Sequence, residues 1–126
     1  MNYTEAALYC ENRMMYLAYF DTSIEVNAVL PWFKAAATQI FGTNILHAII
    51  GLDDLALDGK FVVTKSGALA PALQWAPGQP DGGVAQACVA LNTNDPNVGS
   101  VGMVDYPCGW KYLFICKIPA EFVWIV

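Results

Sequence analysis

The residues with the most distinctive chemistry are the four cysteines, Cys10, Cys88, Cys108 and Cys116. Their spacing matches neither a zinc site nor a CxxC redox pair, so we expect no metal binding or thiol exchange from them. Four cysteines can pair in three ways, and the sequence alone does not choose among these. The pairing therefore stays open at this stage.

Three other groups of residues carry polar chemistry. His47 has no acid and nucleophile in a recognisable relation to it, so we predict a packed or half-exposed strand residue and no enzyme. Asp53 and Asp54 could bind an ion, but adjacent carboxylates are more typical of the turn after a strand. A polar segment could extend a ligand site, although a solvated turn is the favoured interpretation; it contains Asn92, Asn94, Asp95 and Asn97.

The composition limits the classes of function. The chain has 126 residues, a length typical of one domain, so we expect residues 1–126 to form a single domain. Its net charge of −5 and its six basic residues argue against nucleic-acid binding. No apolar run is long enough for a membrane span, and the first residues lack the pattern of a signal peptide. Only 13% of the residues are charged, far below the average of about 25%, which favours a homo-oligomer or larger self-assembly that buries apolar surface.

The order of secondary-structure signals predicts an α+β fold. A first helix is expected over Tyr3 to Leu17, with Thr4 as its N-cap and an apolar face of Ala6, Ala7, Cys10 and Met14. A second helix should follow the capping-box residues of 22–25, and its Pro31 should kink or shorten it. We expect its apolar side to hold Ile24, Val29, Phe33 and Ala37.

Short apolar runs separated by turn residues follow the helices and predict strands. They are His47–Leu52, Phe61–Val63, Cys88–Leu91, Val101–Val104 and Leu113–Lys117. A segment from Ser66 to Ala87 interrupts them, with three prolines and a Gly-Gly pair. Loops of this length are uncommon inside compact domains and are usually functional.

These features together resemble a C-type lectin domain over nearly the whole chain. The most specific match is the stretch from Trp75 to Asp81 together with the cysteine spacing. The weaker matches are Met15–Ala18, Ile49–Leu52, Gly59–Phe61, Cys88–Leu91, Asp105–Cys108 and Phe114–Cys116. The resemblance implies two helices, a mixed and mainly antiparallel sheet, a long ligand-binding loop and two disulfides, Cys10 with Cys116 and Cys88 with Cys108. Such bonds indicate a secreted, extracellular protein.

The resemblance also implies a calcium site in the long loop. Gln79-Pro80-Asp81 resembles the galactose-type motif of the family, in which the proline peptide bond is cis and the flanking side chains hold the ion. Calcium binds six to eight oxygens, and the hydroxyls of a sugar can supply two of them. The corresponding metal-binding and sugar-binding residues of this chain are Gln79, Asp81, Gln86 and Asp105.

Several positions depart from the family pattern. Gln86 stands where the family often has Glu, Val104 where it has Asn, and Met103 where it usually has Trp. The loss of one charge and one ligand should weaken calcium binding to the millimolar range or abolish it. The family also has a strand before the first helix, which these residues do not provide.

Two functions are compatible with these features. The favoured prediction is an extracellular module that binds galactose-type sugars with the help of calcium. The alternative is a structural or self-assembling protein on a C-type-lectin-like scaffold, with weakened or lost calcium and sugar binding. The apolar residues Phe122 to Val126 predict a strand that either folds back onto the last strand of its own sheet or adds to a neighbouring copy, and we favour the first.

Overall fold

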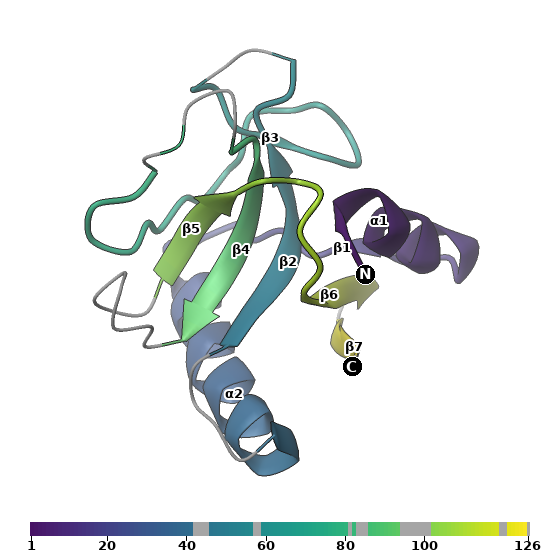
Figure 1. The fold of residues 1–126 in the computed structure, drawn as a ribbon, viewed down its shortest axis with the longest axis vertical. Helices are drawn as coiled ribbons and strands as arrows, with labels where there is room; N and C mark the ends of the chain where they lie inside the picture. Colours follow the sequence, from purple (N-terminus) through teal and green to yellow (C-terminus); the bar gives the residue numbers. More distant parts are fainter. Residues whose placement is uncertain are drawn as a thin grey trace.

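The computed structural model describes residues 1–41, 46–56, 59–80, 82, 86–93, 102–118 and 121–125. Its element order is α1 (Tyr3–Asn12), β1 (Tyr16–Leu17), α2 (Ser23–Phe41), β2 (Leu46–Asp53), β3 (Val62–Val63), β4 (Cys88–Thr93), β5 (Gly102–Tyr106), β6 (Leu113–Ile118) and β7 (Glu121–Ile125). Figure 1 shows the two helices beside one twisted sheet. The predicted α+β class and all five predicted strands are confirmed, although their ends shift by one or two residues.

The strands form one mixed sheet in the order β1-β6-β2-β4-β5, with β3 paired to β2 and β7 paired to β6. The β2–β6 pair is parallel and all the others are antiparallel. The C-terminal segment therefore folds back on its own chain, with Ile115 opposite Trp124 and Ile118 opposite Glu121. This confirms the favoured prediction for the tail.

The first helix is shorter than predicted. It begins after Asn2, whose side chain accepts a hydrogen bond from the Glu5 N–H while the Glu5 side chain accepts one from the Asn2 N–H. The prediction of Thr4 as N-cap is therefore wrong. The helix ends at Asn12, and Met14 follows with a positive φ of 60° and a side chain that is 92% exposed. Met14 thus does not belong to the buried face, because the chain turns there to enter β1.

The second helix is longer than the Pro31 signal suggested. It continues through Pro31 to Phe41, so the expected shortening is wrong. The Glu25 N–H donates to Thr22 Oγ1 (3.2 Å), which provides half of the predicted capping box. Ile24 is 81% exposed, against the prediction, and the buried side chains are Val26, Val29, Leu30 and Phe33.

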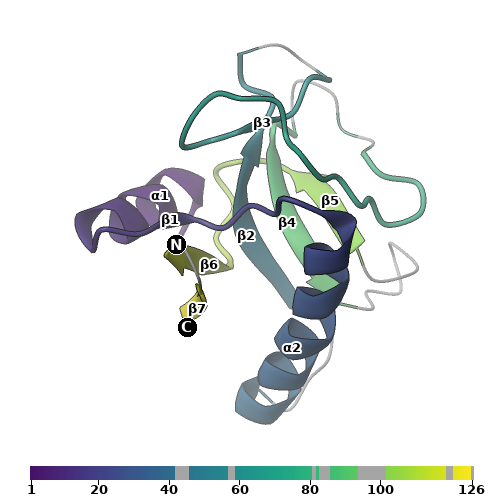
Figure 2. The same ribbon diagram turned by 180° about the vertical axis from the view of Figure 1, so that it is seen from behind.

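Side-chain alternation along the strands builds a separate apolar cluster on each face of the sheet. One cluster contains α2 residues with Ile50, Leu91 and Met103. The other contains Ala6 and Cys10 of α1 with Ile49 and Val104. The helices therefore cover opposite faces, and Figure 2 shows α2 running along the face away from α1.

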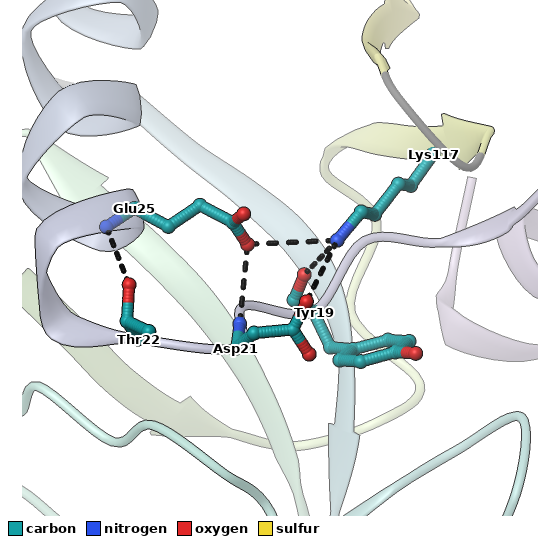
Figure 3. A network of polar contacts seen from close by, with 5 residues as sticks. All are labelled: Tyr19, Asp21, Thr22, Glu25 and Lys117. Carbon is teal, nitrogen blue, oxygen red and sulfur yellow. Dashed lines mark hydrogen bonds and ion pairs between the residues drawn. The ribbon is translucent and has the colours of Figure 1, made fainter.

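A buried lysine joins the last strands to the start of α2 (Figure 3). Lys117 on β6 donates to the Tyr19 carbonyl oxygen (3.2 Å) and forms an ion pair with Glu25 (3.5 Å). Asp21 lies 4.0 Å from the same ammonium group, and its N–H donates to Glu25 Oε1 (3.1 Å). The network holds the α2 N-terminus against β6, and its carboxylates also suit the positive end of the helix dipole.

Candidate functional site

The long loop after β3 is attached to the edge of the sheet by backbone pairing with β5. The Met103 N–H donates to the Gln74 carbonyl oxygen and the Ala76 N–H donates to the Met103 carbonyl oxygen, both at 2.8 Å. Gly102 allows this close approach, because an added Cβ would lie 2.6 Å from the Ala76 nitrogen. The loop therefore leaves the sheet edge from a fixed position.

A tight turn then directs the chain toward Gln79. The Gln79 N–H donates to the Ala76 carbonyl oxygen (3.0 Å), and the central residues of the turn are Pro77 and Gly78. Gly78 has φ +83°, so this is the residue pattern of a type II turn. The next peptide bond, Gln79-Pro80, is cis, as it is in the family motif that these residues resemble.

Two polar groups meet where the loop returns to the sheet. The Gly82 N–H donates to Oδ2 of Asp105 (2.9 Å), and Asp105 is a buried residue of β5. Gln86 packs directly on Gly82, since a Cβ added at Gly82 would lie 2.1 Å from the Gln86 Cδ atom. Asp105, Gly82 and Gln86 therefore form one cluster at the base of the loop. Cys88, which is bonded to Cys108, begins the strand that follows.

Gln79 contributes a side-chain oxygen that is without a hydrogen bond in the part of the chain that the structure describes. Its Oε1 atom is buried and has no hydrogen-bond partner among the described residues. A buried polar atom without a partner costs free energy, and such groups often mark a site for an ion, a water molecule or a ligand. Gln79 stands three residues before Gly82 in the sequence, and the Gly82 N–H donates a hydrogen bond to Asp105.

The sequence relatives of this chain are lectin-like proteins. It is 31% identical over 118 residues to Collectin-10 of Gallus gallus and 25% identical over 118 residues to the hemolymph lipopolysaccharide-binding protein of Periplaneta americana. These matches cover 92% and 90% of this chain but only 38% and 44% of the two proteins, so the chain spans less than half of their length. No protein-family model matches the chain.

Solved structures establish the fold. The C-type lectin CEL-I from Cucumaria echinata matches with a TM-score of 0.75 at 20% identity, over 96% of this chain and 85% of that one. The chain has the C-type lectin-like fold. Human lithostathine (TM-score 0.70, 28% identity) matches over 91% of this chain and 82% of its own. A calcium-independent type II antifreeze protein (TM-score 0.66, 17% identity) matches over 100% and 81%. The fold therefore does not by itself assign a ligand.

The disulfides of this C-type-lectin-like domain are those that the resemblance implied. Cys10 is bonded to Cys116, and Cys88 is bonded to Cys108. The first bond joins the buried face of α1 to β6, and the second joins β4 to the turn after β5. In the part of the chain that the structure describes, no helix is long and apolar enough to cross a membrane.

The predicted ligand residues have different outcomes. Asp105 and Gln86 lie in the cluster at the base of the loop, and Gln79 is close to it along the chain. Asp81 lies outside the described residues. Val104 is 4% exposed and packs in the apolar cluster beneath α1, so the residue at this position serves the core. Met103, in place of the usual Trp, is fully buried in the other cluster and anchors the loop.

The oxygen atoms of the loop fit calcium only as a site of low charge. The described donors are the Gln79 and Gln86 amides and the Asp105 carboxylate, one of whose oxygens already accepts from Gly82. Within the described residues, no three His, Cys, Asp or Glu side chains gather into a metal-binding group. Calcium binds amide and carboxylate oxygens alike, but its affinity rises with the number of charged ligands.

One prediction about the other polar residues needs correction. Asn92 does not lie in a solvated turn: it is fully buried in β4, which continues to Thr93 and pairs Asn92 with His47. Asn94, Asp95 and Asn97 lie outside the described residues. Asp53 is the buried last residue of β2, and its Oδ2 atom accepts from Tyr3 (2.8 Å) and from Thr64 (2.7 Å).

Asp54 is also buried, and its Oδ2 atom accepts from the Gly59 N–H (2.8 Å). Asp53 Oδ1 also accepts from the Leu55 N–H (3.2 Å), so the acidic pair marks the turn after β2 as predicted, but with carboxylates that are buried and hydrogen-bonded. His47, in contrast, is half-buried on β2 and stacks on Tyr112 with ring centroids 5.0 Å apart, as predicted.

Proposed function

We propose that this chain is an extracellular carbohydrate-binding domain, whose long loop recognises galactose-type sugars with the help of a calcium ion. The observation that carries the proposal is the buried Gln79 Oε1 atom, which has no partner among the described residues. A cation would supply the missing interaction, because a carbonyl-type oxygen is a good calcium ligand. The sequence similarity to Collectin-10 and the C-type-lectin-like fold support the same assignment.

Each residue of the site has its own role in this proposal. Gln79 and Asp81 bind the ion from the two sides of Pro80, and Asp105 binds it from β5. Gln86 contributes its amide oxygen from the segment before β4. The bound ion would supply positive charge that two neighbouring sugar hydroxyls can coordinate, while the same side chains hydrogen-bond to those hydroxyls.

The proposed affinity for calcium is low, because two positions of the site offer weaker ligands than the family pattern. Val104 provides no oxygen and is committed to the apolar cluster beneath α1. Gln86 provides an oxygen without a negative charge. Fewer ligands and less charge move calcium sites toward dissociation constants of about 10⁻⁴ to 10⁻³ M, the range of extracellular modules.

Calorimetry can test the site with a matched pair of variants. We expect the parent to bind calcium weakly and to bind galactose only when calcium is present. Gln79→Leu should lose both, because it removes the unpartnered oxygen, and Asp81→Ala should lose both as well. Gln39→Leu makes the same change at an exposed position of α2 and should bind like the parent. Galactose binding that survives EDTA or Gln79→Leu would place the site elsewhere.

A second function is favoured by Val104 and by the edge of the sheet. In the described residues β7 pairs only with β6, so its other edge is available to a second copy of the chain. A self-assembling protein would use this edge without calcium. Sedimentation velocity with calcium and with EDTA distinguishes the two: calcium-independent association without galactose binding supports assembly, and a monomer in both conditions excludes it.

A further inference from the structure

A sequence motif outside the proposed calcium site lies at the start of α1. Asn2-Tyr3-Thr4 is the one Asn-x-Ser/Thr sequon of the chain, the acceptor pattern for an N-linked oligosaccharide in a secreted protein. Because so short a pattern also arises by chance, the surroundings of Asn2 in the folded chain decide whether a glycan fits. Tyr3 is buried, whereas Thr4 is exposed and Asn2 is half-buried.

The helix cap formed by Asn2 uses its side-chain oxygen and not its side-chain nitrogen. Asn2 Oδ1 accepts from the Glu5 N–H (3.0 Å), and the Asn2 N–H donates to Glu5 Oε1 (3.0 Å). Among the described residues, no hydrogen bond from Asn2 Nδ2 is formed. A glycosylated amide keeps its carbonyl oxygen, so a glycan on Nδ2 is compatible with the capping box.

Two backbone contacts bring the turn after β5 beside Asn2. The Tyr3 N–H donates to the Cys108 carbonyl oxygen (3.3 Å). Met1 and Tyr112 exchange two backbone hydrogen bonds, at 3.0 and 3.2 Å. The N-terminal segment therefore runs along this turn, and Figure 1 shows the N-terminus near the chain that leads into β6.

The surface at this turn is apolar and open. Met1 is 48% exposed and Trp110 is 57% exposed, and we call these two residues the Trp110 patch. A Cβ added at Gly109 would meet no atom within 4 Å, so the turn has room for a bulky group. Exposed apolar patches mark surfaces that another molecule covers or that favour aggregation. A hydrophilic oligosaccharide on the neighbouring Asn2 would cover this one.

We propose that Asn2 carries an N-linked oligosaccharide, which covers the Trp110 patch. The donor is an oligosaccharide linked to a lipid pyrophosphate. Asn2 Nδ2 forms a bond to the anomeric carbon of the first sugar, while the bond from this carbon to the pyrophosphate oxygen breaks and the lipid pyrophosphate leaves with the electron pair. The nitrogen loses one proton, and the amide oxygen remains as the helix cap. Glycosylation requires the secretory pathway, so this site rests on the extracellular location of the proposed function but not on calcium or galactose binding.

Expression in eukaryotic cells behind a secretion signal tests the site, with the intact mass measured before and after digestion with peptide N-glycosidase. The parent should lose the mass of a glycan, and peptide mapping should show Asn2 converted to Asp. Thr4→Ser keeps the sequon and should behave like the parent, whereas Thr4→Ala and Asn2→Asp should carry no glycan. Asn2→Asp isolates the glycan from the helix cap, since Asp is an equally good N-cap residue.

A parent that is secreted with both disulfides but without added mass would overturn the site, as would a glycan that persists in Thr4→Ala. Galactose binding of the same samples is measured separately. A glycosylated parent that binds no galactose contradicts the calcium site alone, and an unglycosylated parent that binds galactose contradicts the Asn2 site alone.

Hydroxyl-radical footprinting tests whether the glycan covers the Trp110 patch. Trp110 and Met1 should be oxidised less in the glycosylated parent than in the Asn2→Asp variant. Trp32 is the matched control, because it is 39% exposed on α2, on the other side of the sheet, and should be oxidised equally in both forms. Equal oxidation of Trp110 in the two forms would overturn the proposed cover.

Discussion

The region around α1 and β6 is fixed by covalent and buried polar links, while the long loop is fixed mainly by backbone contacts. In the first region, a disulfide joins Cys10 to Cys116 and the Lys117 network joins β6 to α2. Tyr3 adds a third link from α1 to the end of β2 through Asp53 and Thr64. Burial raises the pKa of Tyr3 above its ordinary value, so its hydroxyl stays protonated as a donor.

The loop contrasts with this region in the type of its links. Its polar attachments among the described residues include the backbone pairing of Gln74 and Ala76 with Met103 and two hydrogen bonds, from Gln74 Nε2 to Asn27 Oδ1 and from the Gly82 N–H to Asp105. Gln79 adds a buried side-chain oxygen that has no partner in the described structure.

The comparison predicts that stability and the proposed ligand binding reside in different regions of the domain. Side chains that form ion pairs or hydrogen-bond networks raise the free energy of unfolding. Side chains that lack partners lower that free energy slightly and are available to bind. Variants in the first region should therefore change melting while leaving ligand affinity intact, and variants in the loop should do the reverse.

The largest loss of stability should follow the removal of either disulfide. Replacing Cys10 and Cys116 by alanine opens a link with a sequence separation of 106, and the chain-entropy model predicts a loss of about 4–5 kcal/mol. The same change at Cys88 and Cys108, with a separation of 20, should cost about 3 kcal/mol. Urea unfolding of both double variants measures the difference. Equal midpoints would show that loop length does not set the contribution of these bonds.

The next largest effect should follow Lys117→Met. This change keeps the apolar stem but removes the charge that pairs with Glu25 and binds the Tyr19 carbonyl. Because Asp21 and Glu25 are partly exposed and regain water, we expect a loss of about 1–2 kcal/mol, less than for a fully buried pair. Lys111→Met, at an exposed residue, should change stability by less than about 0.5 kcal/mol. Thermal unfolding of the two variants checks this ordering.

A smaller effect should follow Tyr3→Phe. It removes the hydroxyl that donates to Asp53 Oδ2 and lies 2.8 Å from Thr64 Oγ1, but the Thr64 hydroxyl still donates to Asp53. We expect a loss of about 1 kcal/mol in urea unfolding, the usual net value of one hydrogen bond. Tyr9→Phe is the matched control on the same helix, because Tyr9 contacts Phe114 with its ring, which the change keeps. A larger loss for Tyr9→Phe would contradict this account of the network.

Some parts of the fold could be predicted from the sequence better than others. The strands were predicted well, because alternating apolar residues and flanking turn residues are local signals. The helix ends were predicted less well: Asn2 rather than Thr4 caps α1, and the positive φ of Met14 ends it. The sequence does carry the first signal, because Asn is a preferred N-cap residue and Glu5 stands at capping-box spacing from Asn2. The residue type of Met14, in contrast, does not indicate its positive φ.

The polar residues were the hardest to interpret. Asn92 was assigned to a solvated turn, yet it is fully buried in β4. Asp53 is also buried, and Tyr3 and Thr64, which donate to its Oδ2 atom, come from distant parts of the chain. Lys117 was predicted only as the end of a strand, and its acceptors near α2 are more than 90 residues away. The hydrogen bond between the side chains of Asn27 and Gln74 gave no local signal either, because the two residues meet only in the folded chain.

The smallest effect on stability, and the most selective on binding, should come from Gly82→Ala. An added Cβ would lie 2.1 Å from Cδ and 2.3 Å from Cβ of Gln86, so the base of the loop must shift. The shift would disturb the Gly82 N–H bond that orients Asp105, and losing such a supporting contact typically costs about 10–100-fold in metal affinity. The free energy of unfolding should change by less than about 1 kcal/mol, since Gly82 belongs to neither apolar cluster.

Gly109→Ala is the matched control for this change. No atom lies within 4 Å of a Cβ added at Gly109, in the turn after Cys108, so both stability and calcium affinity should stay at the parent values. Calcium titration by calorimetry and thermal unfolding of the two glycine variants give the two readouts. If Gly82→Ala lowers the melting temperature as much as Lys117→Met but leaves calcium affinity unchanged, the base of the loop serves the fold. The separation of stability from binding would then be wrong.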